Sequence, residues 1–383
     1  MQNKPYPRTQ AHGFISDAIS CVPFTNQIRH KIMTILKVGI AGHGLVGKRR
    51  HRYIDEHPHL QVIAVSDQKY VAGTDGPAGM RSYEDFRQLI ANETLDVLFV
   101  CLPNAEAAEA TMLGLQHNMH VFCEKPPGRS VEDIRQVRQV ESQNPELKLK
   151  YGFNHRYHDS VLEALALIRD GSLGTVINMR GVYGKSVLTP KIEGIDNPEN
   201  PAYWRQKREV AGGGILLDQG IHMVDLMRCF GGDFTDVKSF VENSFWERDV
   251  EDNAYAIMRS DAGAVAMLHS SATQWRHMFS LVIGLTEGSL TLAGILTSTK
   301  SYGQETLTIT YADDEANGNP REARTSYIHD NSWEREINDF AAHILGNTPV
   351  NIGNSEDALK TMELVYRIYS ADDAWRTRFG ITQ

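Results

Sequence analysis

A glycine-rich hexapeptide has the residue types and the spacing that bind a pyrophosphate group. It reads G-x-G-x-x-G and consists of Gly42, His43, Gly44, Leu45, Val46 and Gly47. The first glycine permits a tight turn, the second lets the backbone approach a pyrophosphate, and the third lets a helix pack closely on a strand. Free N–H groups at the start of that helix attract the phosphate charge. The hexapeptide predicts a dinucleotide-binding turn, and a purely structural glycine turn is the alternative.

An acidic residue follows this turn at the distance expected of a ribose ligand. Asp67 lies about 20 residues beyond Gly47, directly after an apolar run at residues 61–66. A carboxylate there can accept hydrogen bonds from both ribose hydroxyls of an adenosine, whereas it would repel a 2′-phosphate. The sequence therefore favours NAD over NADP, although the neighbouring Lys69 weakens that preference.

A lysine and a histidine form a second set, suited to proton transfer. Lys125 follows Glu124 after an apolar run at residues 119–123, and Pro126 ends the strand there. Three glycines at residues 212–214 precede Asp218 and His222, whose spacing of four places them on one face of a helix. An acid beside a histidine can set its tautomer and raise its basicity.

Each member of this set also has a simpler interpretation. Lys125 alone is typical of a solvated surface lysine, and Asp218 with His222 is typical of a core histidine that has a partner. In the functional interpretation, the three glycines let a bulky ligand approach the backbone. Asp225 is expected on the same side of the helix as Asp218 and His222. An acid–histidine pair can also bind a metal, but no third ligand has suitable spacing, so no metal site is predicted.

The elements around these residues predict an open, doubly wound parallel sheet in the first part of the chain. Apolar runs at residues 35–41, 61–66, 95–102, 119–123 and 147–153 alternate with helical patterns at 48–56, 82–91, 105–117 and 131–142. Ligands of such sheets bind beyond the carboxyl ends of the strands. That rule places the glycine turn, Asp67, Pro103, Asn104, Glu124 and Lys125 along one edge.

The second part of the chain predicts an antiparallel sheet. Short alternating runs lie at residues 176–183, 237–243, 254–259, 264–270, 279–284 and 289–293, and Asp261-Ala262-Gly263 is a hairpin signal. The helix after the three glycines is expected to be amphipathic and to end at Gly231 and Gly232. Residues 312–326 are polar and predict a loop, whereas residues 333–345 and 356–375 predict helices.

Composition and charge exclude several classes of protein. The chain has 383 residues, which suggests two domains or one large one. It has 39 Lys and Arg against 48 Asp and Glu, and this net charge of −9 argues against a general nucleic-acid binder. No apolar stretch is as long as a membrane helix. The four cysteines form no CxxC pair and are expected to be free thiols in a reducing cytoplasm.

Residues 1–34 differ in character from the rest of the chain. They mix proline and glycine with polar residues and contain no continuous signal-peptide core. They are expected to form either a poorly ordered tail or an arm that lies on the body or on a partner subunit. Met33 is an alternative start of the chain.

Several motifs, in order, resemble the glucose-fructose oxidoreductase/inositol dehydrogenase/rhizopine catabolism (Gfo/Idh/MocA) family of oxidoreductases. The matching motifs are residues 42–47, 67, 103–104, 124–126, 152–157, 203–205, 212–222, 251–253 and 284–290. The resemblance implies an NAD-binding Rossmann domain at residues 35–153 and a substrate-binding α/β domain at residues 154–383. The second domain would be built on a large, mostly antiparallel open sheet through which many members pair, so a homodimer or homotetramer is expected. Leu102, Ala107 and Pro127 depart from the family pattern.

The resemblance also implies a catalytic set of Lys125, Asp218 and His222. Oxidising a secondary alcohol removes a hydride from carbon and a proton from oxygen, so a base is needed besides NAD. His222 is the favoured base, with Asp218 either orienting it or holding a neighbouring hydroxyl, and Lys125 stabilising the developing alkoxide. The cationic oxidised nicotinamide could lower the pKa of Lys125 enough to make the lysine the base instead, and both assignments are kept.

The substrate is expected to be a sugar, an inositol or a nucleotide sugar. Aromatic and cationic side chains in residues 183–210 suit sugar C–H faces and a carboxylate or phosphate. Besides the catalytic set, the expected substrate ligands are Asn154, His155, Tyr157, Trp204 and Arg205. The leading hypothesis is an NAD-dependent dehydrogenase. The alternatives are a cofactor-retaining sugar oxidoreductase or redox-assisted glycosidase, and a non-catalytic NAD-dependent sugar sensor, which the presence of the whole catalytic set argues against.

Overall fold

The computed structural model describes residues 34–71, 74–75, 79–188, 203–297 and 299–381. The chain divides into two units, Met1–Thr34 and Ile35–Gln383. The expectations for the N-terminal extension, Met33 and Cys21 lie outside the described residues, as does the part of the expected pocket at residues 189–202. Every element described below belongs to the second unit.

The first sheet has seven strands in the order β3-β4-β2-β1-β5-β6-β7. All neighbours in it are parallel except β3 and β4. The strands are β1 (Leu36–Ala41), β2 (Leu60–Ser66), β3 (Thr74–Asp75), β4 (Arg81–Tyr83), β5 (Val97–Val100), β6 (His120–Glu124) and β7 (Leu149–Gly152). The chain moves outward from β1 in one direction and then in the other, so the strand order reverses between β1 and β5. This confirms the doubly wound sheet, whose ligands bind at that reversal.

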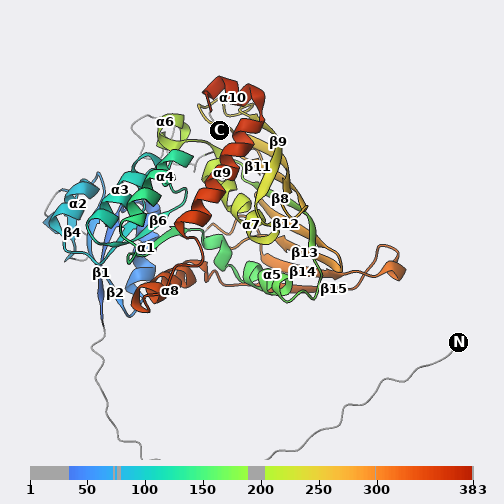
Figure 1. The fold of residues 1–383 in the computed structure, drawn as a ribbon, viewed down its shortest axis with the longest axis horizontal. Coiled ribbons are helices and arrows are strands. Elements are labelled where there is room, and N and C mark those ends of the chain that lie inside the picture. Colours follow the sequence, from blue (N-terminus) through green and yellow to red (C-terminus); the bar gives the residue numbers. More distant parts are fainter. Residues whose placement is uncertain (1–33, 72–73, 76–78, 189–202, 298, 382–383) are drawn as a thin grey trace, which may run out of the picture. The chain divides into compact units, whose positions relative to one another are not determined.

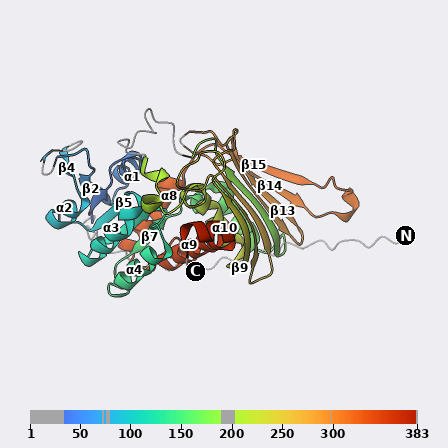
Figure 2. The same ribbon diagram turned by 90° about the horizontal axis from the view of Figure 1, so that it is seen from above.

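Helices cover both faces of the parallel sheet (Figures 1 and 2). α2 (Phe86–Asn92), α3 (Asn104–Gln116) and α4 (Val131–Ser142) pack on one face. α1 (Leu45–Asp55) packs on the other face, beside α8 (Ser332–Leu345) from near the end of the chain. Ile337 and Phe340 of α8 share a buried cluster with the central strands. The second face of this sheet is therefore completed by residues that lie far downstream of β1 in the sequence.

One helix prediction in this region is partly wrong. Ser82 and Tyr83, assigned to a helix by their apolar spacing, pair with β2 as part of β4. The helix begins only at Phe86, after Asp85 accepts a hydrogen bond from the backbone N–H of Arg87 at 2.7 Å. The side-chain cap, rather than the apolar pattern, sets the start of this helix.

The second sheet has eight strands in the order β15-β14-β13-β12-β8-β11-β10-β9. Only β8 and β11 are parallel among its described neighbours, which confirms the mostly antiparallel sheet. The strands are β8 (Val176–Gly184), β9 (Phe234–Glu242), β10 (Asn253–Ser260), β11 (Val265–Ser271), β12 (Met278–Leu285), β13 (Gly288–Ala293), β14 (Glu305–Tyr311) and β15 (Glu322–Tyr327). The loop predicted at residues 312–326 is wrong at its end, where polar residues pair with β14 as an edge strand.

The remaining helices pack on one face of this second sheet or link it to the first, except η5, which lies in the connection between β14 and β15. They are η2 (Asn154–Tyr157), α5 (Asp159–Arg169), η3 (Tyr203–Gln206), α6 (Arg208–Ala211), η4 (Leu216–Gly220), α7 (Ile221–Gly231), η5 (Asp314–Ala316), α9 (Ser355–Ala371) and α10 (Asp373–Phe379). Figure 2 shows α9 and α10 beside β9. The predicted helix at residues 356–375 is divided, because Asp372 caps α10. Among the described residues, no helix is long and apolar enough to cross a bilayer.

The opposite face of the second sheet exposes a patch of large apolar side chains. It consists of Phe240, Tyr255, Ile257 and Met267, which are neighbours across β9, β10 and β11. We call these four residues the outer patch. On β10 and β11 the residues one position along each strand are buried, and on β9 Val241 is buried and Ser239 half-buried, so the alternation is that of a sheet with one packed face.

Candidate active site

The first and last glycines of the glycine turn pack tightly against the protein's own backbone, whereas the middle glycine has free space around it. Gly42 has a φ of 89°, and a Cβ there would lie 2.5 Å from the carbonyl oxygen of Cys101. A Cβ on Gly47 would lie 2.0 Å from the carbonyl oxygen of Gly42, whereas a Cβ on Gly44 would meet no atom within 4 Å. The outer two glycines therefore serve packing, and the middle one leaves room for a ligand. This arrangement fits a pyrophosphate.

The helix after the turn begins earlier than predicted. α1 starts at Leu45 rather than at Lys48, and no side chain caps its first turn. Its first backbone N–H groups therefore lie inside the glycine turn, where they suit an anion.

His43 turns its ring into the protein. Its Nδ1 lies 2.7 Å from the hydroxyl of Tyr70 and its Nε2 lies 3.0 Å from Nδ1 of His51. Burial, together with the nearby His51 and Lys69, lowers the pKa of His43 to about 4. The ring is therefore neutral at physiological pH, and only the backbone of His43 is left for a cofactor.

An acidic cavity of about 450 Å³ opens beyond the carboxyl end of β2. Asp67 lies directly after β2, and its carboxylate is 3.2 Å from the amine of Lys69. Arg87, the only arginine or lysine among the described lining residues, is shared with Asp85 and Glu109. The lining residues are Ser66, Asp67, Gln68, Glu84, Asp85, Phe86, Arg87, Gln88, Leu102 and Glu106. Four carboxylates thus surround the position at which an adenosine ribose is expected.

Pro103 and Asn104, which were expected to contact the cofactor, begin α3. Asn104 is buried, and its side-chain N–H donates to the carbonyl oxygen of Ala211 at 2.7 Å. The amide therefore ties the first sheet to the segment that precedes the three glycines.

The amine of Lys125 lies among groups from three distant segments. Lys125 follows β6 and is joined to Pro126 by a cis peptide bond. Its Nζ donates to the carbonyl oxygen of Asp218 at 2.5 Å and lies 3.9 Å from the carboxylate oxygen Oδ1 of the same residue. Two further cations approach that carboxylate, Lys185 at 3.2 Å and Arg205 at 3.9 Å. Three cations therefore surround one acid.

The burial of this cluster changes its proton equilibria. Burial lowers the pKa of Lys125, although the charges of Asp218 and Glu124 oppose the change. Burial acts to raise the pKa of Asp218, but Lys185, Lys125 and Arg205 outweigh it and hold the pKa below its ordinary value. Asp218 is therefore an anion at physiological pH, and Lys125 loses its proton more readily than an exposed lysine.

His222 stacks on a second imidazole rather than pairing with an acid. Its ring lies 3.7 Å from that of His155, with an angle of 11° between the planes. Its Nδ1 is buried and has no hydrogen-bond partner among the described residues. Burial and the charge of Lys125 lower the pKa of His222 well below 6.5, so the ring is neutral.

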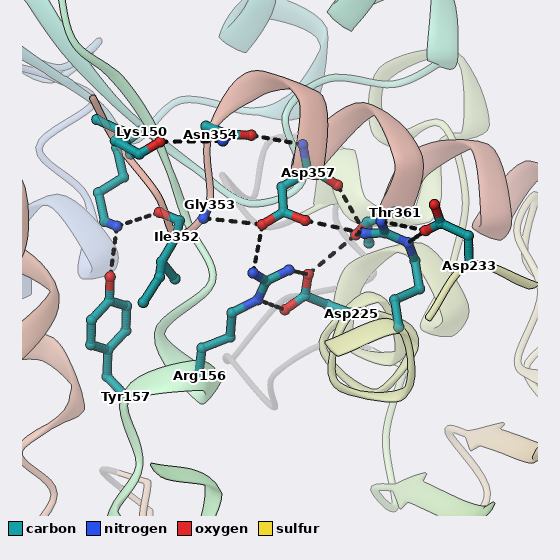
Figure 3. Close-up of polar contacts among 12 residues, drawn as sticks. Lys150, Arg156, Tyr157, Asp225, Asp233, Ile352, Gly353, Asn354, Asp357 and Thr361 are labelled. Carbon is teal, nitrogen blue, oxygen red and sulfur yellow. Dashed lines mark hydrogen bonds and ion pairs between the residues drawn. The ribbon is translucent and has the colours of Figure 1, made fainter. Parts of the chain in front are cut away.

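The expected pairing of Asp218 with His222 is wrong. Residues Leu216–Gly220 form a π-helical turn, which changes the angular spacing between the two residues, and no hydrogen bond joins their side chains. Asp225, expected beside them, instead accepts two hydrogen bonds from Arg156, at 2.6 and 2.7 Å (Figure 3). α7 is also buried on nearly all sides rather than amphipathic.

The three glycines serve protein packing and not the approach of a ligand. A Cβ on Gly212 would lie 2.2 Å from the carbonyl oxygen of Arg129, and one on Gly214 would lie 2.1 Å from that of Glu251. The buried carboxylate of Glu251 accepts hydrogen bonds from the N–H groups of Gly214 and Leu216, at 2.7 and 3.0 Å. The interpretation of these glycines as a ligand approach is therefore wrong, because the protein's own backbone fills that space.

Aromatic side chains continue from the histidine stack. The hydroxyl of Tyr183 lies 3.0 Å from Nε2 of His155, and the ring of Tyr302 packs edge-on against Tyr183. The hydroxyl of Tyr302 in turn accepts a hydrogen bond from Gln219 at 2.5 Å. Tyr302 lies in no recognised motif and was not predicted, and Gln219 was not named as a site residue although it lies within the motif at residues 212–222. Lys185 belongs to the segment at residues 183–210, whose cationic side chains were expected near the substrate.

The other expected substrate ligands divide between this cluster and its surroundings. The guanidinium of Arg205 lies 4.4 Å from the ring of Trp204, beside Asp218. Asn154 donates to Ser332 at 3.0 Å and lies against His155. The hydroxyl of Tyr157 accepts a hydrogen bond from Lys150 (Figure 3). It donates one to Asp339, so this side chain belongs to a separate network. No group of three or more potential ligands that could hold a metal ion is found in the described part of the chain.

Comparison with known proteins identifies the family. The oxidoreductase family with an NAD-binding Rossmann fold matches residues 36–152, and the GFO/IDH/MocA C-terminal domain matches residues 161–291. The chain belongs to the Gfo/Idh/MocA oxidoreductase family. The matched residues include the glycine turn, Asp67, Lys125, Asp218 and His222.

Relatives with sequence similarity include two sugar dehydrogenases. D-glucoside 3-dehydrogenase of Escherichia coli is 26% identical over 360 residues, which cover 88% of this chain and 95% of that protein. Levoglucosan dehydrogenase of Pseudarthrobacter phenanthrenivorans is 26% identical over 231 residues, 57% of each chain, so this chain spans less than two thirds of that relative. The structure of levoglucosan dehydrogenase with NADH and levoglucosan has a TM-score of 0.74 at 20% identity, covering 89% of this chain and 98% of that chain. This last likeness shows a shared fold.

Proposed function

We propose that this protein is an NAD-dependent dehydrogenase that oxidises a secondary hydroxyl of a neutral sugar or cyclic polyol. The observation that carries the proposal is the position of the Lys125 amine. It lies at the carboxyl end of a strand in the dinucleotide-binding sheet, within hydrogen-bond distance of the segment that supplies Asp218 and His222. The dehydrogenase relatives, which are named for glucosides and levoglucosan, support a substrate of this class.

NAD is favoured over NADP because the cavity beyond β2 is acidic. Asp67, Glu84, Asp85 and Glu106 line it, and Arg87 is already paired with two carboxylates. A 2′-phosphate would add about two negative charges at neutral pH to this environment, and no described cation of the cavity is free to compensate them. The backbone of the glycine turn and the start of α1 would hold the pyrophosphate, and Asp67 would bind the ribose hydroxyls.

A neutral substrate is favoured because the cations of the site are occupied. Lys185 and Arg205, which would suit a carboxylate or a phosphate, both face the Asp218 carboxylate. The half-buried aromatic side chains of Trp204 and Tyr302 offer apolar faces instead. Nucleotide sugars and acidic sugars are therefore less suited to this site than neutral rings.

Lys125 is the better candidate for the base. A bound nicotinamide supplies the acceptor for the hydride, and the chain must remove the hydroxyl proton. The protonated form of Lys125 is stabilised by its hydrogen bond to the carbonyl oxygen of Asp218 and by the negative charges of Asp218 and Glu124. A protonated His222 would have no acceptor at Nδ1, because that atom is buried without a partner among the described residues. We therefore assign proton removal to the neutral amine of Lys125 and a neutral hydrogen bond to the substrate to Nε2 of His222.

The outer patch is the proposed subunit interface. Phe240, Tyr255, Ile257 and Met267 are each more than 40% exposed and lie together on one sheet face. Contiguous exposed apolar surface of this kind marks an interaction site. We propose a homodimer or homotetramer formed through this face. The three described cysteines are free thiols, which supports a reducing compartment such as the cytoplasm.

The test is turnover with a panel of neutral sugars, anhydro sugars and inositols, followed by NADH absorbance at 340 nm. We expect NAD-dependent oxidation of at least one neutral ring and slower reaction of its uronic-acid counterpart. Failure of every neutral ring, with NADH binding intact, would contradict the proposal.

A further inference from the structure

Arg50 is a fully buried arginine in a helix whose neighbouring basic residues are largely exposed. Its side chain has no solvent exposure, and its guanidinium lies 4.4 Å from the ring of Phe122 and 4.3 Å from that of Trp333. Phe122 belongs to β6 and Trp333 to α8. The guanidinium is thus held between the first sheet and a helix from near the end of the chain.

Two carboxylates from distant segments share this one cation. Nε of Arg50 donates to Oε1 of Glu124 at 2.6 Å, and Nη2 donates to Oε2 of Glu336 at 2.6 Å. Glu124 is the last residue of β6 and immediately precedes Lys125. Glu336 is fully buried on α8, and its second oxygen has no partner among the described residues. A buried arginine with two acids of this kind is costly to assemble, so a role beyond stability is worth testing.

We propose that Arg50 is a positioning residue for Lys125: it fixes and neutralises the Glu124 carboxylate at the end of β6, while Glu336 anchors Arg50 from α8. The proposal rests on the proposed function in so far as Lys125 is the amine that takes the proton. Arg50 itself contacts Glu124, the last residue of β6, and acts on Lys125 only through that residue.

The sign of the effect follows from the charges around Lys125. The negative charge of Glu124 acts to raise the pKa of Lys125, and so does that of Asp218. Arg205 and Lys185 act to lower it, and His222 and His155 face the same amine as neutral rings. Arg50 compensates the charge of Glu124. Its removal leaves that charge uncompensated, which favours the protonated lysine and so removes the base at neutral pH.

The experiment measures how readily Lys125 is acetylated as a function of pH, using acetic anhydride on the full chain and mass spectrometry. It needs neither substrate nor turnover. We expect Arg50→Gln to raise the midpoint, the pH at which acetylation of Lys125 is half-maximal, by about one unit, which corresponds to a tenfold loss of neutral amine at fixed pH. We expect Glu124→Gln to move it downward, and the double variant Arg50→Gln/Glu124→Gln to return it close to the wild-type value.

A matched control is Arg135→Gln, which removes an exposed arginine paired with Glu363 and should leave the midpoint unchanged. If Arg50→Gln does not fold, Arg50→Lys replaces it and is expected to shift the midpoint in the same direction by a smaller amount. Where turnover is observed, Arg50→Gln should lower kcat about tenfold at neutral pH and Arg50→Lys should lower it less, while the KM for NAD changes less than about twofold in both.

Midpoints that stay unchanged in the folded arginine variant and in Glu124→Gln would overturn the proposal, because Arg50 would then have a structural role alone. A double variant that behaves like Arg50→Gln would also overturn it. If the two variants show these opposite shifts but the wild-type protein oxidises no neutral ring, the proposed function is refuted and the positioning role remains.

Discussion

The two ends of the coenzyme site carry opposite charges. At the adenosine end, four carboxylates line a cavity open to water beyond β2. At the reaction end, Lys125, Lys185 and Arg205 surround Asp218 in a half-buried cluster. The acidic end selects against an additional phosphate, and the basic end favours the negative charge that develops on a reacting oxygen. The reaction end is expected to be the more sensitive to substitution, because the proton that leaves the substrate hydroxyl is taken up there.

Removal of the Lys125 amine is the strongest test of the reaction end. Lys125→Ala should lower kcat about a thousandfold, because the hydroxyl proton loses its acceptor, while the dissociation constant for NADH changes little. Stopped-flow turnover and NADH fluorescence titration measure the two quantities. Lys37→Ala, which removes an exposed lysine of the same sheet, is the matched control. A near-wild-type kcat in the Lys125→Ala variant would remove the lysine from the mechanism.

The pH dependence of kcat/KM distinguishes Lys125 from His222 as the base. Oxidation requires neutral Lys125, so kcat/KM should fall about tenfold per pH unit as the pH drops below the lysine pKa, which lies below 10.5. The pKa of His222 is lowered by burial, so no second fall in kcat/KM, or limb of the profile, is expected near pH 6.5. His222→Asn should therefore lower the rate across all pH values without moving the limb. A limb near 6.5 that disappears in this variant would make the histidine the base.

Loss of the Asp67 carboxylate should weaken the selectivity of the adenosine end. Asp67→Ala removes the acceptor for the ribose hydroxyls and part of the negative field, so KM for NAD should rise about tenfold while that for NADP stays constant or falls. Steady-state kinetics with both coenzymes gives the ratio. Glu132→Ala, an acid exposed on α4, serves as the control. Equal losses for the two coenzymes would show that the acidic cavity does not distinguish them.

Substitutions in the outer patch should affect neither the adenosine end nor the reaction end of the coenzyme site. Ile257→Glu places a charge among exposed apolar neighbours and is expected to shift the assembly toward monomers, with kcat within about twofold of wild type. Sedimentation velocity reports the change. Arg135→Glu on α4 should leave the assembly unchanged. A wild-type protein that is monomeric at all concentrations would contradict the proposed interface.

Local sequence signals were sufficient for five strands of the first sheet, β1, β2, β5, β6 and β7, but not for the short strands β3 and β4 at its edge. The strands carry continuous apolar runs because they are buried on both faces, and the glycine turn needs its outer glycines for backbone contacts that no other residue permits. The outermost strand β15 was missed for the opposite reason. Its residues are mostly exposed and polar, so no alternation of buried and exposed positions distinguishes it from a loop.

Long-range contacts could not be predicted. The basic residues around Arg50 in α1 suggest a solvated helix face, and nothing local indicates that Trp333 and Glu336 cover this one arginine. The π-helical turn before α7 likewise depends on Glu251, whose carboxylate binds the first N–H groups of that segment. The spacing of Asp218 and His222 therefore suggested a pair that the tertiary structure separates.

The most direct test of the central claim is a crystal structure of the protein with NADH. We predict the adenosine ribose against the Asp67 carboxylate, the pyrophosphate over Gly44, and the nicotinamide beside the Lys125 amine with His222 facing the same space. A nicotinamide bound away from Lys125, or an adenosine outside the acidic cavity, would contradict the account.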